Sequence, residues 1–256
     1  MKSLERDLRA GRDSGRKLLL PYFMGGLTPD WTEHVAAAVL AGADAVEIGI
    51  PFSDPMMDGP VIQEAAMRAL ERHVTLDSLC EDLARLDATV PLIAMTYYNI
   101  VLHYGLERCA GKLHSSGIDG AIIPDLALEE LDPWRSACDD HDVATVLLVA
   151  PSTPPKRVER LATRTEGFAY ASARMAVTGK SDGAGEGERV VGAIRRSSDV
   201  PALIGIGIAS ADQAKAAADV ADGVIVGSAL VQVILDGGGA REIETFIREF
   251  RSAIDG

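Results

Sequence analysis

The sequence predicts a (β/α)₈ barrel, an α/β fold in which eight parallel strands alternate with helices. Short, almost continuously apolar runs alternate with longer amphipathic segments along the whole chain, as expected for parallel strands buried on both faces. The strand–helix pattern occurs eight times without a linker. The length of 256 residues suits one such barrel, which typically needs about 250 residues. We therefore expect a single TIM-barrel domain over residues 1–256, with an extra N-terminal helix.

The predicted strands are short runs rich in apolar and β-branched residues, bounded by glycine, proline or polar residues. They are Leu18–Phe23, Ala45–Ile50, Pro91–Thr96, Gly120–Pro124, Ala144–Val149, Gly167–Ser172, Ala202–Gly205 and Gly223–Val226. Because most of them lack strict apolar–polar alternation, we expect both faces of the sheet to be covered.

The intervening segments carry apolar residues at helical spacing. A first helix, roughly Leu4–Gly11, precedes the first strand and is expected to close the bottom of the barrel. The others are Trp31–Ala41, Gln63–Glu71, Leu76–Leu86, Leu106–Ser116, Glu130–Asp140, Lys156–Thr163, Glu188–Ser197, Ala211–Asp219 and Arg241–Ile254. Gly42 and Gly117 each follow a helix, where a residue with positive φ lets the next strand begin at once.

A doubly wound sheet is the alternative fold. Its support is Gly205–Ser210, a degenerate G-x-G-x-x-G. This loop lies near the wrong end of the chain and lacks the acidic residue about 20 positions later that a dinucleotide site needs.

Composition excludes several classes of function. The net charge of −13 argues against nucleic acid or an anionic membrane surface as a partner. No apolar run is long enough to cross a membrane, and the charged N-terminus is unlike a signal peptide. Three distant cysteines are expected to be reduced core thiols, and the histidines lack metal-ligand spacing. We expect a cytoplasmic protein without a metal.

In a barrel of this kind the functional groups lie at the C-terminal ends of the strands. Glu47 lies within the second strand, on the same side as Ala45 and Gly49, whose small size we expect to leave room for a substrate. Burial would raise its pKa toward the range of a general acid or base. The alternative is a structural carboxylate paired with a buried cation.

A second carboxylate, Asp58, follows in the proline-rich loop 51–60. Three prolines stiffen this loop, and Gly59 would permit a sharp bend. We expect the loop to hold Asp58 opposite Glu47. The alternative is that Asp58 is the N-cap of the following helix.

Glycines near the other end of the chain predict a phosphate site. Gly205–Gly207 ends the seventh strand and Val226–Ala229 ends the eighth, each before a helix. Helix N-termini at these two positions are the usual phosphate site of such barrels, and Ser228 adds a hydroxyl donor. No lysine lies at a strand end. Two carboxylates and a phosphate site indicate proton transfer on a phosphorylated substrate.

After the sixth strand, Ala173–Gly187 is long, glycine-rich and polar. Such a loop in a compact domain is typical of a lid.

At these positions the chain resembles the α subunit of tryptophan synthase. The most specific match is Glu47–Pro55 together with Asp58–Pro60 and Gln63. Further matches, in the order of the family, are Met95–Asn99, Pro124–Leu126, Val177–Gly179, Gly205–Ile208 and Gly227–Ser228.

The resemblance implies a TIM barrel that cleaves indole-3-glycerol phosphate to indole and D-glyceraldehyde 3-phosphate. It implies Glu47 as the proton-transferring acid and base, and Asp58 as the anchor of the indole N–H. The substrate-binding residues that it implies are Tyr170, Thr178, Gly179, Gly207, Gly227 and Ser228. Ala176 stands where the family has glycine, which would stiffen the lid.

The resemblance also implies a partner, the β subunit of tryptophan synthase, in an α2β2 complex to which indole is passed. The cofactor, pyridoxal phosphate, would belong to that partner, and we expect none in this chain. Two alternatives stay open: a stand-alone lyase that releases free indole, and a mainly activating subunit with weak activity. The loop Pro51–Pro55, which faces the partner in the family, favours an α subunit that works with a β subunit over the stand-alone lyase.

Overall fold

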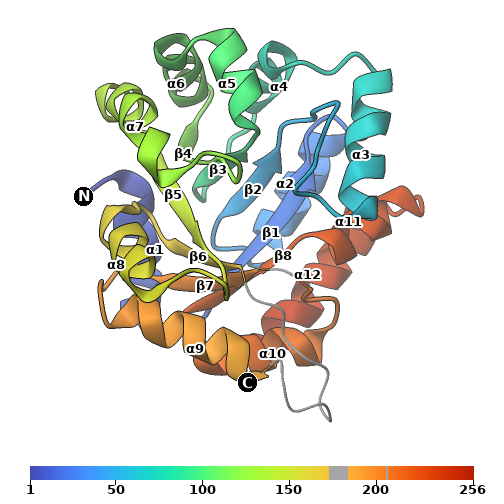
Figure 1. Ribbon diagram of the computed structural model, residues 1–256. Coiled ribbons are helices and arrows are strands. Elements are labelled where there is room, and N and C mark those ends of the chain that lie inside the picture. Colours follow the sequence, from blue (N-terminus) through green and yellow to red (C-terminus); the bar gives the residue numbers. More distant parts are fainter. Residues whose placement is uncertain (173–183, 206) are drawn as a thin grey trace.

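The computed structural model describes residues 1–172, 184–205 and 207–256. Its strands form one closed parallel barrel in chain order (Figure 1). They are β1 (Leu18–Met24), β2 (Val46–Gly49), β3 (Leu92–Met95), β4 (Ile118–Ile122), β5 (Ala144–Val149), β6 (Ala169–Ser172), β7 (Ala202–Gly205) and β8 (Gly223–Val226). The barrel closes where β8 pairs with β1, Leu18 opposite Gly223. This confirms the predicted barrel and excludes the doubly wound sheet.

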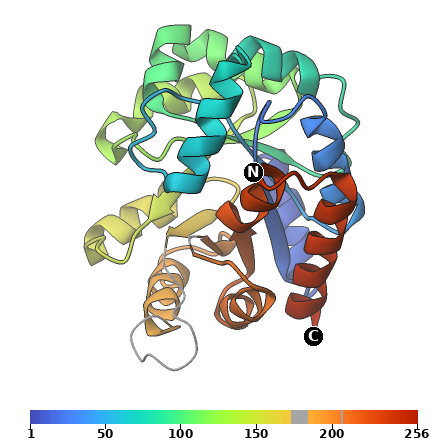
Figure 2. The same ribbon diagram turned by 90° about the vertical axis from the view of Figure 1, so that its right-hand side faces the viewer.

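Helices surround the barrel, and α2 and α12 lie side by side (Figures 1 and 2). The helical elements are α1 (Ser3–Asp13), α2 (Trp31–Leu40), α3 (Pro60–Glu71), α4 (Leu76–Leu83), α5 (Tyr98–Tyr104), α6 (Leu106–Ser115), the short 3₁₀ helix η1 (Leu128–Glu130), α7 (Leu131–Asp140), α8 (Pro155–Arg164), α9 (Ala184–Arg195), α10 (Ala211–Val220), α11 (Ser228–Leu235) and α12 (Ala240–Asp255). No helix among the described residues is long and apolar enough to cross a membrane.

The helices differ from the prediction at α5, α9 and α11, and α11 (Ser228–Leu235) lies outside the predicted helix ranges, although a helix was expected after the eighth strand. Helix α5 was not predicted, because its seven residues are too few to show a clear helical period. Helix α9 begins at Ala184, inside the segment predicted as a lid. The glycines of its first turn favour a loop, but α9 packs against α8 and α10, and such tertiary contacts outweigh local propensity. The rest of the predicted lid, residues 173–183, lies outside the described residues.

The helix-ending glycines behave as predicted. Gly42 follows α2 with a φ of +107°, and Gly117 follows α6 with a φ of +84°. After α2, the backbone N–H of Ala43 donates to the carbonyl of Ala38 at 3.1 Å, which closes the helix end and starts the next strand.

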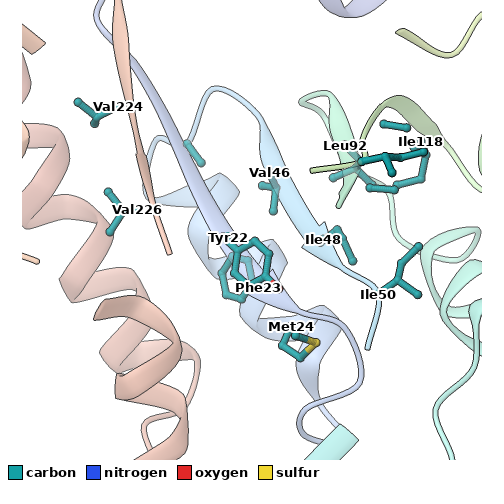
Figure 3. Close-up of a cluster of buried hydrophobic side chains, with 14 of the residues drawn as sticks. Tyr22, Phe23, Met24, Val46, Ile48, Ile50, Leu92, Ile118, Val224 and Val226 are labelled. Atoms are coloured by element: carbon teal, nitrogen blue, oxygen red, sulfur yellow. The ribbon is translucent and has the colours of Figure 1, made fainter. Parts of the chain in front are cut away.

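Alternating residues divide the strands between two cores. Val46, Ile48 and Ile50 belong to the outer core between the strands and the helices (Figure 3). Ala45 belongs to the inner core, in the barrel lumen. Because side chains alternate along a strand, Glu47 faces the lumen as well.

Helix α1 closes the bottom of the barrel, as predicted. Leu4 and Leu8 are fully buried in the inner core. Two glycines make room for Leu4, since a Cβ on either Gly120 or Gly167 would lie 2.6 Å from its Cδ2 atom. The lumen is therefore sealed on the side opposite the strand ends that carry the candidate site.

Candidate active site

The described residues form a cavity of about 840 Å³ at the C-terminal ends of the strands. Predicted site residues from both halves of the chain line this cavity: Glu47, Asp58, Tyr170, Gly207, Gly227 and Ser228. The predicted residues Thr178 and Gly179, and Ala176 beside them, lie outside the described residues. The fold thus brings both carboxylates and the glycines after β7 and β8 to one space.

Glu47 projects into the lumen from β2 and is only 1% exposed. Its Oε1 atom is buried and has no hydrogen-bond partner among the described residues. Burial raises the pKa of this carboxyl to about 8, and burial is the only cause of the shift. The interpretation of Glu47 as the partner of a buried cation is therefore wrong for the part of the chain that the structure describes.

The sequence suggested that Gly49 leaves room for a substrate. In the structure this room is taken by a side chain of the protein. A Cβ at this position would overlap the hydroxyl of Tyr22, which lies on β1 opposite Glu47 in the strand register. Tyr170 on β6 has the same relation to Gly205 on β7. Each glycine therefore makes space for the ring of a tyrosine on the preceding strand.

Tyr97 holds Asp58 in place. It lies two residues after the end of β3. The Tyr97 hydroxyl donates to Oδ2 of Asp58 at 2.9 Å, and the backbone N–H of Met57 donates to the Tyr97 oxygen at 2.9 Å. The ring of Phe52 stacks on Tyr97 with 5.0 Å between ring centres. Burial raises the pKa of Asp58, while the Tyr97 hydrogen bond opposes this rise.

The N-cap alternative for Asp58 is wrong. Gly59 is the N-cap of α3, and no side chain caps this helix. The backbone at Gly59 is extended with a φ of −77°, so the expected glycine-dependent bend is absent too. The carboxylate of Asp58 thus faces the cavity instead of the helix N-terminus.

The two helix N-termini predicted to bind phosphate differ. At α10, Ser210 accepts a hydrogen bond from the Gln213 N–H, and the Gln213 side chain accepts one from the Ala209 N–H at 2.7 Å. At α11, the N-cap Gly227 offers no side chain, and Gly227 and Ser228 both line the cavity. Of the two, only the N-terminus of α11 is left uncapped by a side chain and lines the cavity.

The described lining residues include three carboxyl side chains, Glu47, Asp58 and Glu186, and no lysine, arginine or histidine. An anionic group must consequently be bound by backbone N–H groups, hydroxyls and the α11 N-terminus. Within the described ranges no three His, Cys, Asp or Glu side chains come together as metal ligands.

Several lining residues were not predicted from the sequence, Tyr22 and Met95 among them. Tyr22 could have been found from the alternation in β1, where Leu18 and Leu20 point into the lumen and Tyr22 is next on that side. Its ring also contacts the cluster drawn in Figure 3, but its hydroxyl lies against Gly49. Tyr97 stands in a motif that the sequence analysis had already singled out.

Comparison with known proteins gives one consistent family. The family model "Tryptophan synthase alpha chain" matches residues 8–253. The tryptophan synthase alpha chain of Methanosarcina mazei is 39% identical over 95% of this chain and 91% of its own length. That of Laribacter hongkongensis is 38% identical over the full length of both.

Solved structures agree with this result. The chain matches a crystal structure of tryptophan synthase from M. tuberculosis in an aminoacrylate-bound form with a TM-score of 0.90 and 32% identity. The match covers 99% of this chain and 100% of that one.

Proposed function

Because the chain belongs to the tryptophan synthase alpha chain family, lyases that cleave indole-3-glycerol phosphate, we propose that Glu47 and Asp58 carry out this cleavage. The observation that carries the proposal is that the carboxyl group of Glu47 is buried in the lumen and that no described residue pairs with it as a cation. The products are indole and D-glyceraldehyde 3-phosphate. The barrel runs in chain order, and we propose that residues 1–256 act as one domain.

Glu47 gives one proton to the substrate and takes up another from it. With a pKa of about 8, it is mostly protonated at neutral pH and gives its proton to C3 of the indole ring. The resulting carboxylate then accepts the proton of the glycerol hydroxyl next to the ring. As that hydroxyl becomes a carbonyl, the carbon–carbon bond breaks and its electron pair returns to the ring. Glu47 ends protonated, as it began.

Asp58 has a different role, as an anion beside the ring nitrogen. When C3 gains a proton, positive charge develops on the indole N–H, and a carboxylate in hydrogen-bond reach stabilises it. The hydroxyl of Tyr97 donates to Asp58 and favours its ionised form. In this proposal Glu47 is protonated and Asp58 is ionised at the start of the reaction.

We propose that the phosphate group binds at the N-terminus of α11, beside Gly207, Gly227 and Ser228, which line the cavity. From the resemblance we assign Thr178 and Gly179 to the same end, although both lie outside the described residues. Tyr170 also lines the cavity, and we place it between the carboxyl groups and the phosphate. Binding energy from the phosphate would hold the reacting bond beside Glu47.

We further propose a β subunit as partner, in an α2β2 complex in the cytoplasm. The support is that similar solved structures are tryptophan synthases of M. tuberculosis. Beside the loop Pro51–Pro55, the apolar side chains of Met56 and Met57 are 80% and 58% exposed, as a partner surface requires. Pyridoxal phosphate would be bound by that partner, and this chain would bind no cofactor.

The first test replaces Glu47. Glu47→Gln keeps the shape of the side chain but removes its proton, so indole release from indole-3-glycerol phosphate should fall by roughly 10²–10⁴-fold. Substrate binding, measured by calorimetry, should stay close to that of the wild type. A variant within a few-fold of the wild-type rate would contradict the assignment.

The second test replaces Asp58. Asp58→Asn keeps the size of the side chain but removes the charge that stabilises the ring nitrogen, so indole release should fall by about 100-fold or more. The melting temperature serves as the control. If the variant altered only thermal stability, Asp58 would be structural.

The third test concerns the partner. Addition of a tryptophan synthase β subunit should raise the rate of indole-3-glycerol phosphate cleavage and should consume the indole when serine is present. An unchanged rate with full release of free indole would favour the stand-alone lyase. Negligible cleavage by the chain, with activation of the β subunit, would favour the activating subunit.

A further inference from the structure

Tyr22 places a hydroxyl group next to Glu47 in the barrel lumen. It lies on β1 opposite Glu47, and its oxygen occupies the space that a Cβ of Gly49 would need. Glu47 and Gly49 face the same side of β2, because they are two residues apart on one strand. The Tyr22 hydroxyl therefore lies one step closer to the strand ends than the Glu47 carboxyl, and a substrate that reaches Glu47 passes beside it.

This hydroxyl is available to a ligand. Tyr22 is 7% exposed and lines the cavity, yet its oxygen forms no hydrogen bond within the part of the chain that the structure describes. A hydroxyl that faces a cavity can donate to a hydrogen-bonding group of a bound ligand. Burial and the negative charges of Asp58 and Glu47 raise the pKa of Tyr22 well above its ordinary value, so it remains a donor.

The hydroxyl of Tyr97, another polar group of the cavity region, does not have the same freedom. The hydroxyl of Tyr97 is already engaged, since it donates to Asp58 and accepts from the N–H of Met57. Tyr170 also lines the cavity, but it stands on β6, against Gly205, whereas the strands that pair with β2 are β1 and β3. Tyr22 is thus the hydroxyl that the strand register places beside the proton-transferring group.

We propose that the Tyr22 hydroxyl donates a hydrogen bond to the glycerol oxygen that Glu47 deprotonates, and that it stabilises the charge developing there. The inference rests on the proposed function of the cavity. In this step the hydroxyl proton of the substrate moves to the Glu47 carboxylate, and the O–H electron pair forms the carbonyl. The pair of the carbon–carbon bond restores the C2–C3 double bond of indole, and the ring nitrogen regains its lone pair. Tyr22 keeps its own proton throughout.

The test is Tyr22→Phe, which retains the ring beside Gly49 and removes only the donor. We expect kcat for indole release to fall by about 100-fold, as for the loss of one donor to a developing oxyanion, with KM almost unchanged. The probe 3-indolylpropyl phosphate has the ring and the phosphate but neither hydroxyl, so its Kd should be the same for both proteins. Its binding also shows that the cavity of the variant is folded.

Tyr104→Phe is the matched control. It also removes one tyrosine hydroxyl, which donates to Asp77 outside the residues that line the cavity, and it should leave kcat unchanged. A Tyr22→Phe enzyme with nearly wild-type kcat would overturn the inference. So would an equal loss in kcat and in binding of 3-indolylpropyl phosphate, because Tyr22 would then only shape the cavity. If the wild-type protein released no indole, the proposed function itself would fail.

Discussion

The burial of one carboxyl group, that of Glu47, is the constraint on which the rest of the site depends. An ionised carboxylate in an apolar space is costly unless it is paired, and the described residues offer Glu47 neither a cation nor a hydrogen bond to Oε1. The protein therefore retains the proton on Glu47. The same environment that makes the charge costly makes the group a useful acid at neutral pH.

Other parts of the barrel preserve this environment. Below Glu47, Leu4 and Leu8 of α1 seal the lumen; on the side of the strand ends, Tyr22 packs against Gly49. The proposed anion site is the N-terminus of α11, and no lysine or arginine appears among the described lining residues. A cation there would lower the pKa of Glu47. Binding phosphate through backbone N–H groups is thus compatible with a protonated Glu47.

The sequence predicted the barrel because the apolar runs and helical periods are strong local signals, and β5, β7 and β8 have the predicted bounds. It predicted less well where a residue depends on a distant neighbour. Gly49 was interpreted as space for a substrate, but the ring that fills this space comes from β1. Asp58 is of a residue type that often caps a helix and stands just before one. Only its hydrogen bond with Tyr97 shows where its carboxylate lies. Neither contact has a signature in local sequence.

Direct titration of Glu47 tests the central claim most sharply. The carbonyl stretch of a protonated carboxylic acid can be followed by infrared difference spectroscopy against pH, with Glu47→Gln as the reference that lacks the band. Because the folded pKa is raised above the unfolded value, Glu47 favours folding below the unfolded pKa of about 4.5, and this contribution is lost as pH rises toward 8. We predict a band that persists at pH 7 and disappears near pH 8. A band that disappears near pH 4.5 would show a solvated or paired carboxylate and would contradict this account.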